Sequence, residues 1–79
     1  MKNEQIITVL QEIFQEILDE ENVVLSDETT ANDIEGWDSL THIQLVVSIE
    51  KKFNVKFSSK EILSWKNVAE MVISIKSKI

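Results

Sequence analysis

The chain has 79 residues, of which 43% are hydrophobic and 28% are charged, and its formal net charge at pH 7 is −6. This length allows one domain with a small hydrophobic core, and it leaves little protein to enclose a substrate pocket. The absence of cysteine excludes disulfides and cysteine-based metal sites or nucleophiles. The negative charge argues against nucleic acid as a partner, because phosphate binding needs clustered Lys and Arg.

The charge is unevenly distributed along the chain. Residues 1–38 hold eleven of the fourteen acidic residues and one lysine, a net charge of −10. Residues 39–79 hold three acidic residues and seven lysines, a net charge of +4. The N-terminal segment lacks the apolar run of a signal peptide, and no stretch reaches the length of a transmembrane helix. We therefore expect one domain over residues 1–79, in a soluble cytoplasmic protein without membrane contact.

Residues 3–18 have the periodicity of an amphipathic helix. Apolar residues recur at spacings of three and four between polar ones, at Ile6, Ile7, Leu10, Ile13, Phe14, Ile17 and Leu18. The acidic run at residues 19–21 ends this helix, because negative charge is unfavourable at a helix C-terminus.

A long polar connector follows the first helix, and its length in so small a domain is typical of a functional or anchored loop. Residues 23–25 (Val-Val-Leu) have strand-like composition, but no second strand of comparable quality exists to pair with them. We interpret them as a loop anchor, together with Ile34 and Trp37. Gly36 is the only glycine, which suggests a turn that needs positive φ or close backbone approach.

The segment after the connector predicts a second helix that begins at Ser39. Asp38 is a good N-cap residue, so Ser39 becomes the first helical residue and its hydroxyl projects at the positive end of the helix dipole. A phosphate ester at this position is stabilised by that field and by the unpaired N–H groups of the first turn. An ordinary serine at a helix start is the alternative.

Two apolar stripes lie on this second helix, because each residue advances the direction by about 100°. One stripe is predicted to face the core and consists of Leu45, Val46, Ile49 and Phe53. The other is predicted to stay partly exposed as a docking surface beside Ser39, and consists of Leu40, Ile43 and Val47. The alternative is a central helix that buries both stripes.

Two further helix starts are indicated by capping patterns. Ser58 and Glu61 have the spacing of a capping box, which predicts a short helix containing Ile62 and Leu63. Asn67 and Glu70 repeat the pattern before a last helix. Its inward residues are predicted to be Val68, Met71, Val72 and Ile75, with Lys76 and Lys78 in its final turn.

The residues around Ser39 resemble those of the acyl carrier proteins. The resemblance is carried by Gly36-Trp37-Asp38-Ser39-Leu40 and by the residues that follow, Ile43, Leu45, Ile49, Glu50 and Phe53, and it extends over nearly all 79 residues. It implies an all-α four-helix bundle with three longer helices, a short third helix and a long loop between helices one and two.

The resemblance also implies a function. A covalent 4′-phosphopantetheine arm, derived from coenzyme A, is expected on Ser39, with acyl groups carried as thioesters on its thiol. The protein is then a carrier without a reaction of its own. Its expected partners are a phosphopantetheinyl transferase and the enzymes that load, elongate or transfer acyl groups, and it is expected to be a monomer.

Further site residues follow from this resemblance. Asp38 adjoins the modified serine and is expected to assist the transferase. The ring of Trp37 is expected to contact the base of the arm because Trp37 immediately precedes Asp38, and a packing role is the alternative. The expected partner-binding residues are Leu40, Ile43, Gln44, Val47 and Glu50.

Two other chemistries are disfavoured. His42 lies one turn after Ser39, but the chain has no Gly-x-Ser-x-Gly elbow and no evident oxyanion hole. We expect His42 to pack under the loop or to hydrogen-bond to it. If Gly36 were the sixth position of a calcium loop, Ala31 and His42 would occupy positions one and twelve, where carboxylates are required. No metal site is therefore expected.

The chain departs from fatty-acid carriers in two respects. The helix after the serine is typically strongly acidic in that branch, whereas here it carries Gln44, Lys51 and Lys52, with Glu50 retained. Trp37 replaces a residue that is commonly small. Both features favour a specialised pathway, with polyketide, modified-sugar or aminoacyl chemistry. The alternatives are an aminoacyl or peptidyl carrier and a helical interaction module without a prosthetic group.

Overall fold

Four α-helices and one short 3₁₀ turn form the fold in the computed structural model, which describes residues 2–79. In chain order the elements are α1 (Asn3–Leu18), η1 (Ala31–Asp33), α2 (Ser39–Phe53), α3 (Ser59–Ser64) and α4 (Val68–Lys76). No strand occurs within the described residues. The predicted all-α fold with a short third helix is confirmed, and η1 is an element that the sequence pattern did not predict.

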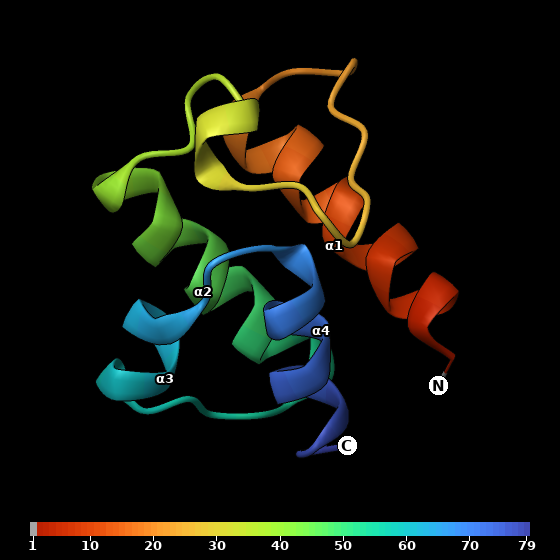
Figure 1. The fold of residues 1–79 in the computed structure, drawn as a ribbon, viewed down its shortest axis with the longest axis vertical. Helices are drawn as coiled ribbons and strands as arrows, with labels where there is room; N and C mark the ends of the chain where they lie inside the picture. The colour runs from red at the N-terminus through yellow and green to blue at the C-terminus, as the bar shows by residue number, and fades with distance from the viewer. Residues whose placement is uncertain (1) are drawn as a thin grey trace.

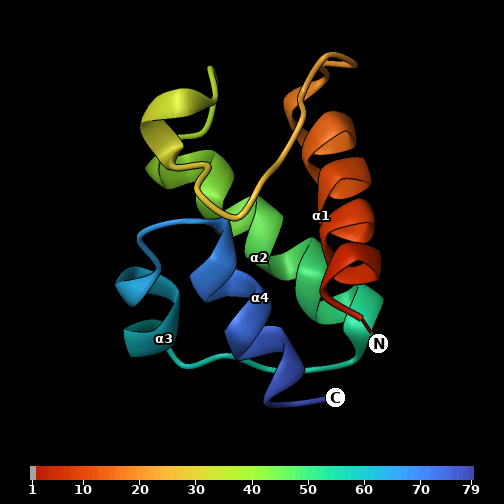
Figure 2. The ribbon, with the colours of Figure 1, turned by 45° about the vertical axis from the view of Figure 1, so that its right-hand side comes forward.

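Helices α1, α2 and α4 surround the core, and α3 lies at the side of α2 and α4 (Figures 1 and 2). The side chains that are at most 1% exposed are Ile6, Leu10, Phe14, Leu45, Ile49, Val68, Met71, Val72 and Ile75. They come from the three longer helices, whereas α3 contributes no buried residue. No helix within residues 2–79 has the length and apolar character needed to span a membrane.

The connector between α1 and α2 is attached to α1 through glutamine side chains. Val23 and Leu25 are each 6% exposed, and Val24 between them is 71% exposed, which is the alternation of a strand. Gln15 Nε2 donates to the Val23 carbonyl at 3.0 Å, and the Leu25 N–H donates to Gln11 Oε1 at 3.0 Å. The predicted loop anchor is thus confirmed, and it needs no partner strand because side chains of α1 pair with its backbone.

The same connector caps the start of α4. The N–H groups of Val68 and Ala69 donate to the carbonyls of Thr29 and Asp27, at 2.9 and 3.0 Å. These first-turn donors have no partner inside their own helix. The connector is therefore held between α1 and α4, and its far end, which leads into α2, has a fixed position.

Two details of the predicted last helix are wrong. Asn67 caps α4 by accepting from the Glu70 N–H, but the Glu70 carboxylate accepts from the Lys66 N–H at 3.2 Å and does not return to Asn67. The Glu70 carboxylate therefore binds the N–H of the residue before the cap, and not the N–H of the cap itself. Lys78 lies beyond the end of α4, and its ammonium pairs with Glu61 of α3 at 3.4 Å.

Candidate functional site

The start of α2 is fixed by a reciprocal capping box between Asp38 and Thr41. The Thr41 N–H donates to Asp38 Oδ1 at 2.9 Å, and the Asp38 N–H donates to the Thr41 hydroxyl oxygen at 2.8 Å. The Thr41 hydroxyl in turn donates to the Gly36 carbonyl at 2.6 Å. Sequence reasoning identified Asp38 as the cap but missed Thr41, although its place three residues after the cap is the capping-box position.

The Asp38 carboxyl and Gly36 both contribute to this capped start. The hydrogen bond from the Thr41 N–H holds the pKa of the Asp38 carboxyl below its ordinary value. Gly36 has φ +89°, as the sequence predicted, and a Cβ there would lie 3.7 Å from Leu18 Cδ2. The positive φ therefore favours glycine at this position, whereas the space around it would accept a Cβ.

Ser39 is the first residue of α2 and is exposed to solvent. Within residues 2–79 no hydrogen bond engages its hydroxyl group. Because the cap at Asp38 fixes the backbone, the Ser39 side chain leaves the positive end of the helix from a fixed position. A buried hydroxyl at this position would have excluded attachment chemistry, and the structure does not have one.

A hollow of about 430 Å³ lies beside Ser39, between the start of α2, α3 and the α3–α4 connection. Its aliphatic wall consists of Ile43, Ile62 and Leu63, and Asp38, Ser39 and Lys66 are the polar and charged lining residues. Its aromatic wall consists of Trp37, His42 and Trp65. The hollow therefore combines an apolar interior with an exposed hydroxyl, one carboxylate and one cation.

The aromatic wall is part of a row of contacting aromatic rings, which we call the file of rings. Phe14 meets Trp37 edge-on with ring centroids 4.8 Å apart, and the rings of Trp37 and His42 are nearly parallel, with centroids 6.0 Å apart and an interplanar angle of 22°. His42 then meets Trp65 edge-on at 5.9 Å, and Trp65 meets Phe57 at 5.1 Å. The file connects the α1 side of the core to the α2–α3 connection through the hollow.

His42 uses both ring nitrogens in this arrangement. Trp37 Nε1–H donates to His42 Nδ1 at 3.0 Å, and His42 Nε2 lies 3.2 Å from the Ile62 carbonyl oxygen. The predicted hydrogen bond between His42 and the loop is confirmed, whereas the contact with α3 was missed. With both nitrogens engaged, neither is available to act as a base for Ser39.

The second apolar stripe of α2 is exposed, as predicted. The exposed fractions are 70% for Leu40, 53% for Ile43 and 45% for Val47, and Gln44 beside them is also exposed. The alternative in which both stripes are buried is therefore wrong. Glu50 is half-buried, and its carboxylate accepts from the Phe57 N–H at 2.8 Å, so it also fixes the α2–α3 connection.

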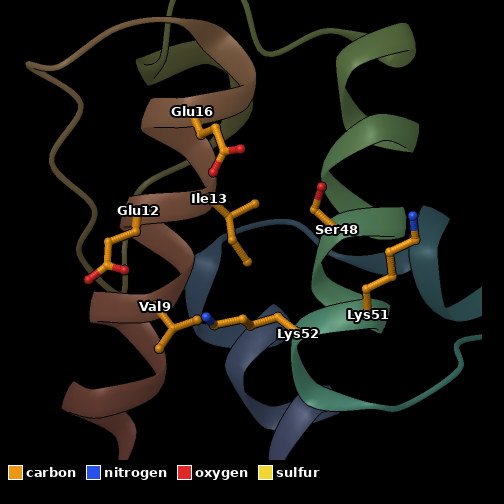
Figure 3. Close-up of a pocket in the computed structure, with 7 residues that line it drawn as sticks. All are labelled: Val9, Glu12, Ile13, Glu16, Ser48, Lys51 and Lys52. Carbon is orange, nitrogen blue, oxygen red and sulfur yellow. The ribbon is translucent and has the colours of Figure 1, made fainter.

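A second depression of about 350 Å³ lies between α1 and α2 (Figure 3). Glu12 and Glu16 line it from α1, whereas Lys51 and Lys52 line it from α2. Figure 3 shows the Lys52 side chain extending across the depression towards Val9. This charged groove was not predicted. Lys51 lies one helical turn after Val47, so the groove adjoins the exposed stripe of α2.

Comparisons with known proteins agree with this geometry. Residues 8–75 match the family model described as a phosphopantetheine attachment site. A similar solved structure is the solution NMR structure of holo acyl carrier protein from Geobacter metallireducens, with a TM-score of 0.84 and 39% sequence identity. The match covers 91% of this chain and 83% of that chain. The chain belongs to the acyl carrier protein family.

This membership confirms the predictions of a carrier and of its cofactor. An acyl carrier protein is a carrier and not an enzyme, and it is modified by a phosphopantetheinyl transferase. Its cofactor is covalently attached 4′-phosphopantetheine. No group of three or more histidine and carboxylate side chains in the described part of this acyl carrier protein is arranged to hold a metal ion.

Proposed function

We propose that Ser39 is the attachment residue of the arm, in a domain of residues 1–79 that presents acyl groups to successive enzymes. The observation that carries this proposal is an exposed hydroxyl at the first residue of a capped helix, free of hydrogen bonds within residues 2–79. When bound, the arm supplies a thiol on which acyl groups are held as thioesters. The protein supplies a fixed base for it.

The surroundings of Ser39 fit an attached phosphodiester. The unpaired N–H groups of the first turn of α2 and the helix dipole favour a negative charge at this position. Lys66 places a cation on the lining of the same hollow. Asp38 is held in its capping role by Thr41, and we propose that it also contributes to recognition by the transferase. Trp37 lines the hollow next to Ser39, which supports contact with the base of the arm.

The exposed stripe of α2 is our proposed partner-binding surface. Leu40, Ile43 and Val47 give it apolar area next to the attachment residue, and Gln44 adds a neutral hydrogen-bonding group. Such a surface suits weak contacts that form and break with many enzymes. Glu50 lies at its far end, and we propose that it takes part with the carboxylate oxygen that does not bind Phe57. We also propose that the carrier acts as a monomer.

We further propose that the partners belong to a specialised pathway. The support is the positive charge of Lys51 and Lys52 on α2, which is opposite in sign to the acidic face of fatty-acid carriers. Partners with acidic docking surfaces match this charge, and partners with basic surfaces do not. Loading and elongation by fatty-acid synthase enzymes should therefore be slower than for a housekeeping carrier. Equal turnover contradicts this assignment.

Intact mass spectrometry tests the attachment residue. The protein is incubated with coenzyme A and a broad-specificity phosphopantetheinyl transferase, and we expect the mass to rise by one phosphopantetheinyl group. Ser39→Ala should abolish the increase. Ser59→Ala is a matched control, because Ser59 is also an exposed first residue of a capped helix, and it should be modified like the wild type.

The same experiment separates two alternatives. An unchanged mass in a folded protein favours an interaction module that binds a partner through the stripe of Leu40, Ile43 and Val47. An aminoacyl or peptidyl carrier gives the same mass increase as an acyl carrier. It is distinguished by presenting the modified protein to amino-acid-activating and acyl-activating enzymes and identifying which group is loaded.

A further inference from the structure

The helix α3 is the shortest α-helix within residues 2–79. It has six residues and none of them is buried. Its contacts with the rest of the protein include the ion pair between Glu61 and Lys78, at 3.4 Å, and the contact between the Ile62 carbonyl and His42. Because α3 supplies Ile62 and Leu63 to the hollow beside Ser39, the position of α3 sets the shape of that hollow.

The protonation state of His42 follows from its partners. A tryptophan Nε1–H can only donate, so His42 Nδ1 must accept from Trp37. The single proton of the neutral ring then lies on Nε2, which donates to the Ile62 carbonyl oxygen at 3.2 Å. One ring thereby joins the loop before α2 to α3 on the other side of the hollow. We call this connection the Trp37–His42–Ile62 clip.

We propose that His42 is a positioning residue whose neutral Nε2–H tautomer clips Trp37 and α3 to α2 and so sets the width of the hollow beside Ser39. Trp37 and Ile62 both line the hollow, and the ring of His42 lies between its two partners. The edge-on contact with Trp65 helps to keep the ring in this orientation. The purpose of the hollow rests on the proposed function, whereas the clip does not.

Protonation of the His42 ring breaks only one of the two hydrogen bonds of the clip. A protonated imidazole has a hydrogen on Nδ1, which then faces the Trp37 Nε1–H as a second donor, so this bond is lost. The Nε2–H keeps its bond to the Ile62 carbonyl. The charged groups that line the same hollow are Asp38 and Lys66. The Trp37 contact therefore requires a neutral ring, whereas the contact with α3 does not.

Nuclear magnetic resonance of the apo protein tests the clip without any partner enzyme. The ring nitrogen shifts of His42 report which nitrogen carries the proton. The indole N–H signal of Trp37 reports its hydrogen bond to His42. Hydrogen exchange of the amides of residues 59–64 reports the attachment of α3.

The expected result is a proton on Nε2 and none on Nδ1. His42→Phe keeps a ring but no ring nitrogen, so it should change the Trp37 signal and accelerate exchange in α3 about fivefold, as expected for the loss of one hydrogen bond. His42→Gln keeps a donor and an acceptor, and it should keep α3 exchange slower than in His42→Phe.

A proton on Nδ1 in the wild type overturns the proposal, as does a Trp37 signal that His42→Phe leaves unchanged. If His42→Phe does not fold, Trp37→Phe removes the N–H donor while keeping an aromatic ring and should leave α3 exchange unchanged, and the wild-type tautomer measurement still decides. Failure of phosphopantetheinylation with an intact clip would overturn the proposed function and leave the clip standing. The two proposals therefore fail separately.

Discussion

Truncation of Leu40 should weaken partner binding with little effect on folding. Leu40 is the residue next to Ser39 and its side chain is 70% exposed, so an enzyme that reaches the Ser39 hydroxyl must cover it. Leu45, on the opposite side of the same helix, is 0% exposed. The substitutions Leu40→Ala and Leu45→Ala therefore make the same chemical change on one helix, once on the proposed docking surface and once in the core.

The size of each effect follows from the exposed fraction. Full burial of a leucine side chain contributes about 1.5–3 kcal/mol. The 70% of Leu40 left exposed by folding corresponds to about 1–2 kcal/mol on docking, which is roughly a 5- to 30-fold loss in kcat/KM. Folding should lose less than about 1 kcal/mol. Leu45→Ala should instead lower the free energy of unfolding by about 2–5 kcal/mol.

The assay measures kcat/KM for phosphopantetheinyl transfer from coenzyme A, with the free energy of unfolding measured by urea titration. We expect Leu40→Ala to react more slowly through a higher KM and Leu45→Ala to be less stable. Wild-type kcat/KM in Leu40→Ala would refute the reasoning, because the side chain would then not be covered during transfer. A stability loss in Leu40→Ala as large as that in Leu45→Ala would also refute it.

Three further predictions concern the cap, the turn and the charge of α2. The hydrogen bond from the Thr41 N–H lowers the pKa of Asp38, so the cap stabilises the protein at neutral pH. This contribution is lost as the pH falls through the pKa of Asp38 in the folded protein. Asp38→Asn should therefore flatten the dependence of Tm on pH in the acid range. Gly36→Ala should lower the free energy of unfolding by about 1–2 kcal/mol, because φ is +89°, and an unchanged urea midpoint would contradict this. Reversal of Lys51 and Lys52 to glutamate should increase turnover by fatty-acid synthase enzymes, and a decrease would count against the proposed charge matching.

Local patterns predicted much of this fold. The bounds of α1, the cap at Asp38 and the two stripes of α2 follow from residues within one or two turns of each other, so a periodicity argument applies to them. The positive φ of Gly36 follows in the same way from its place before the cap. These features also place Ser39, which explains why the candidate attachment residue was recognisable before the structure.

Contacts between distant residues were not predictable in this way. The pairing of Gln11 with Leu25 spans 14 residues, and that of His42 with Ile62 spans 20 residues. Any polar side chain satisfies the local pattern equally well, and only the packing of helices decides which partner it meets. The hollow and the charged groove belong to this class, because each is formed by elements that are not adjacent in the chain.

The most direct test of the central claim is the location of the added group. After reaction with coenzyme A and a phosphopantetheinyl transferase, the protein is digested and fragmented in the mass spectrometer, so that each serine is examined separately. We expect the entire added mass on Ser39 and none on any other serine. Modification of a different serine, or none in a protein shown to be folded, would contradict it.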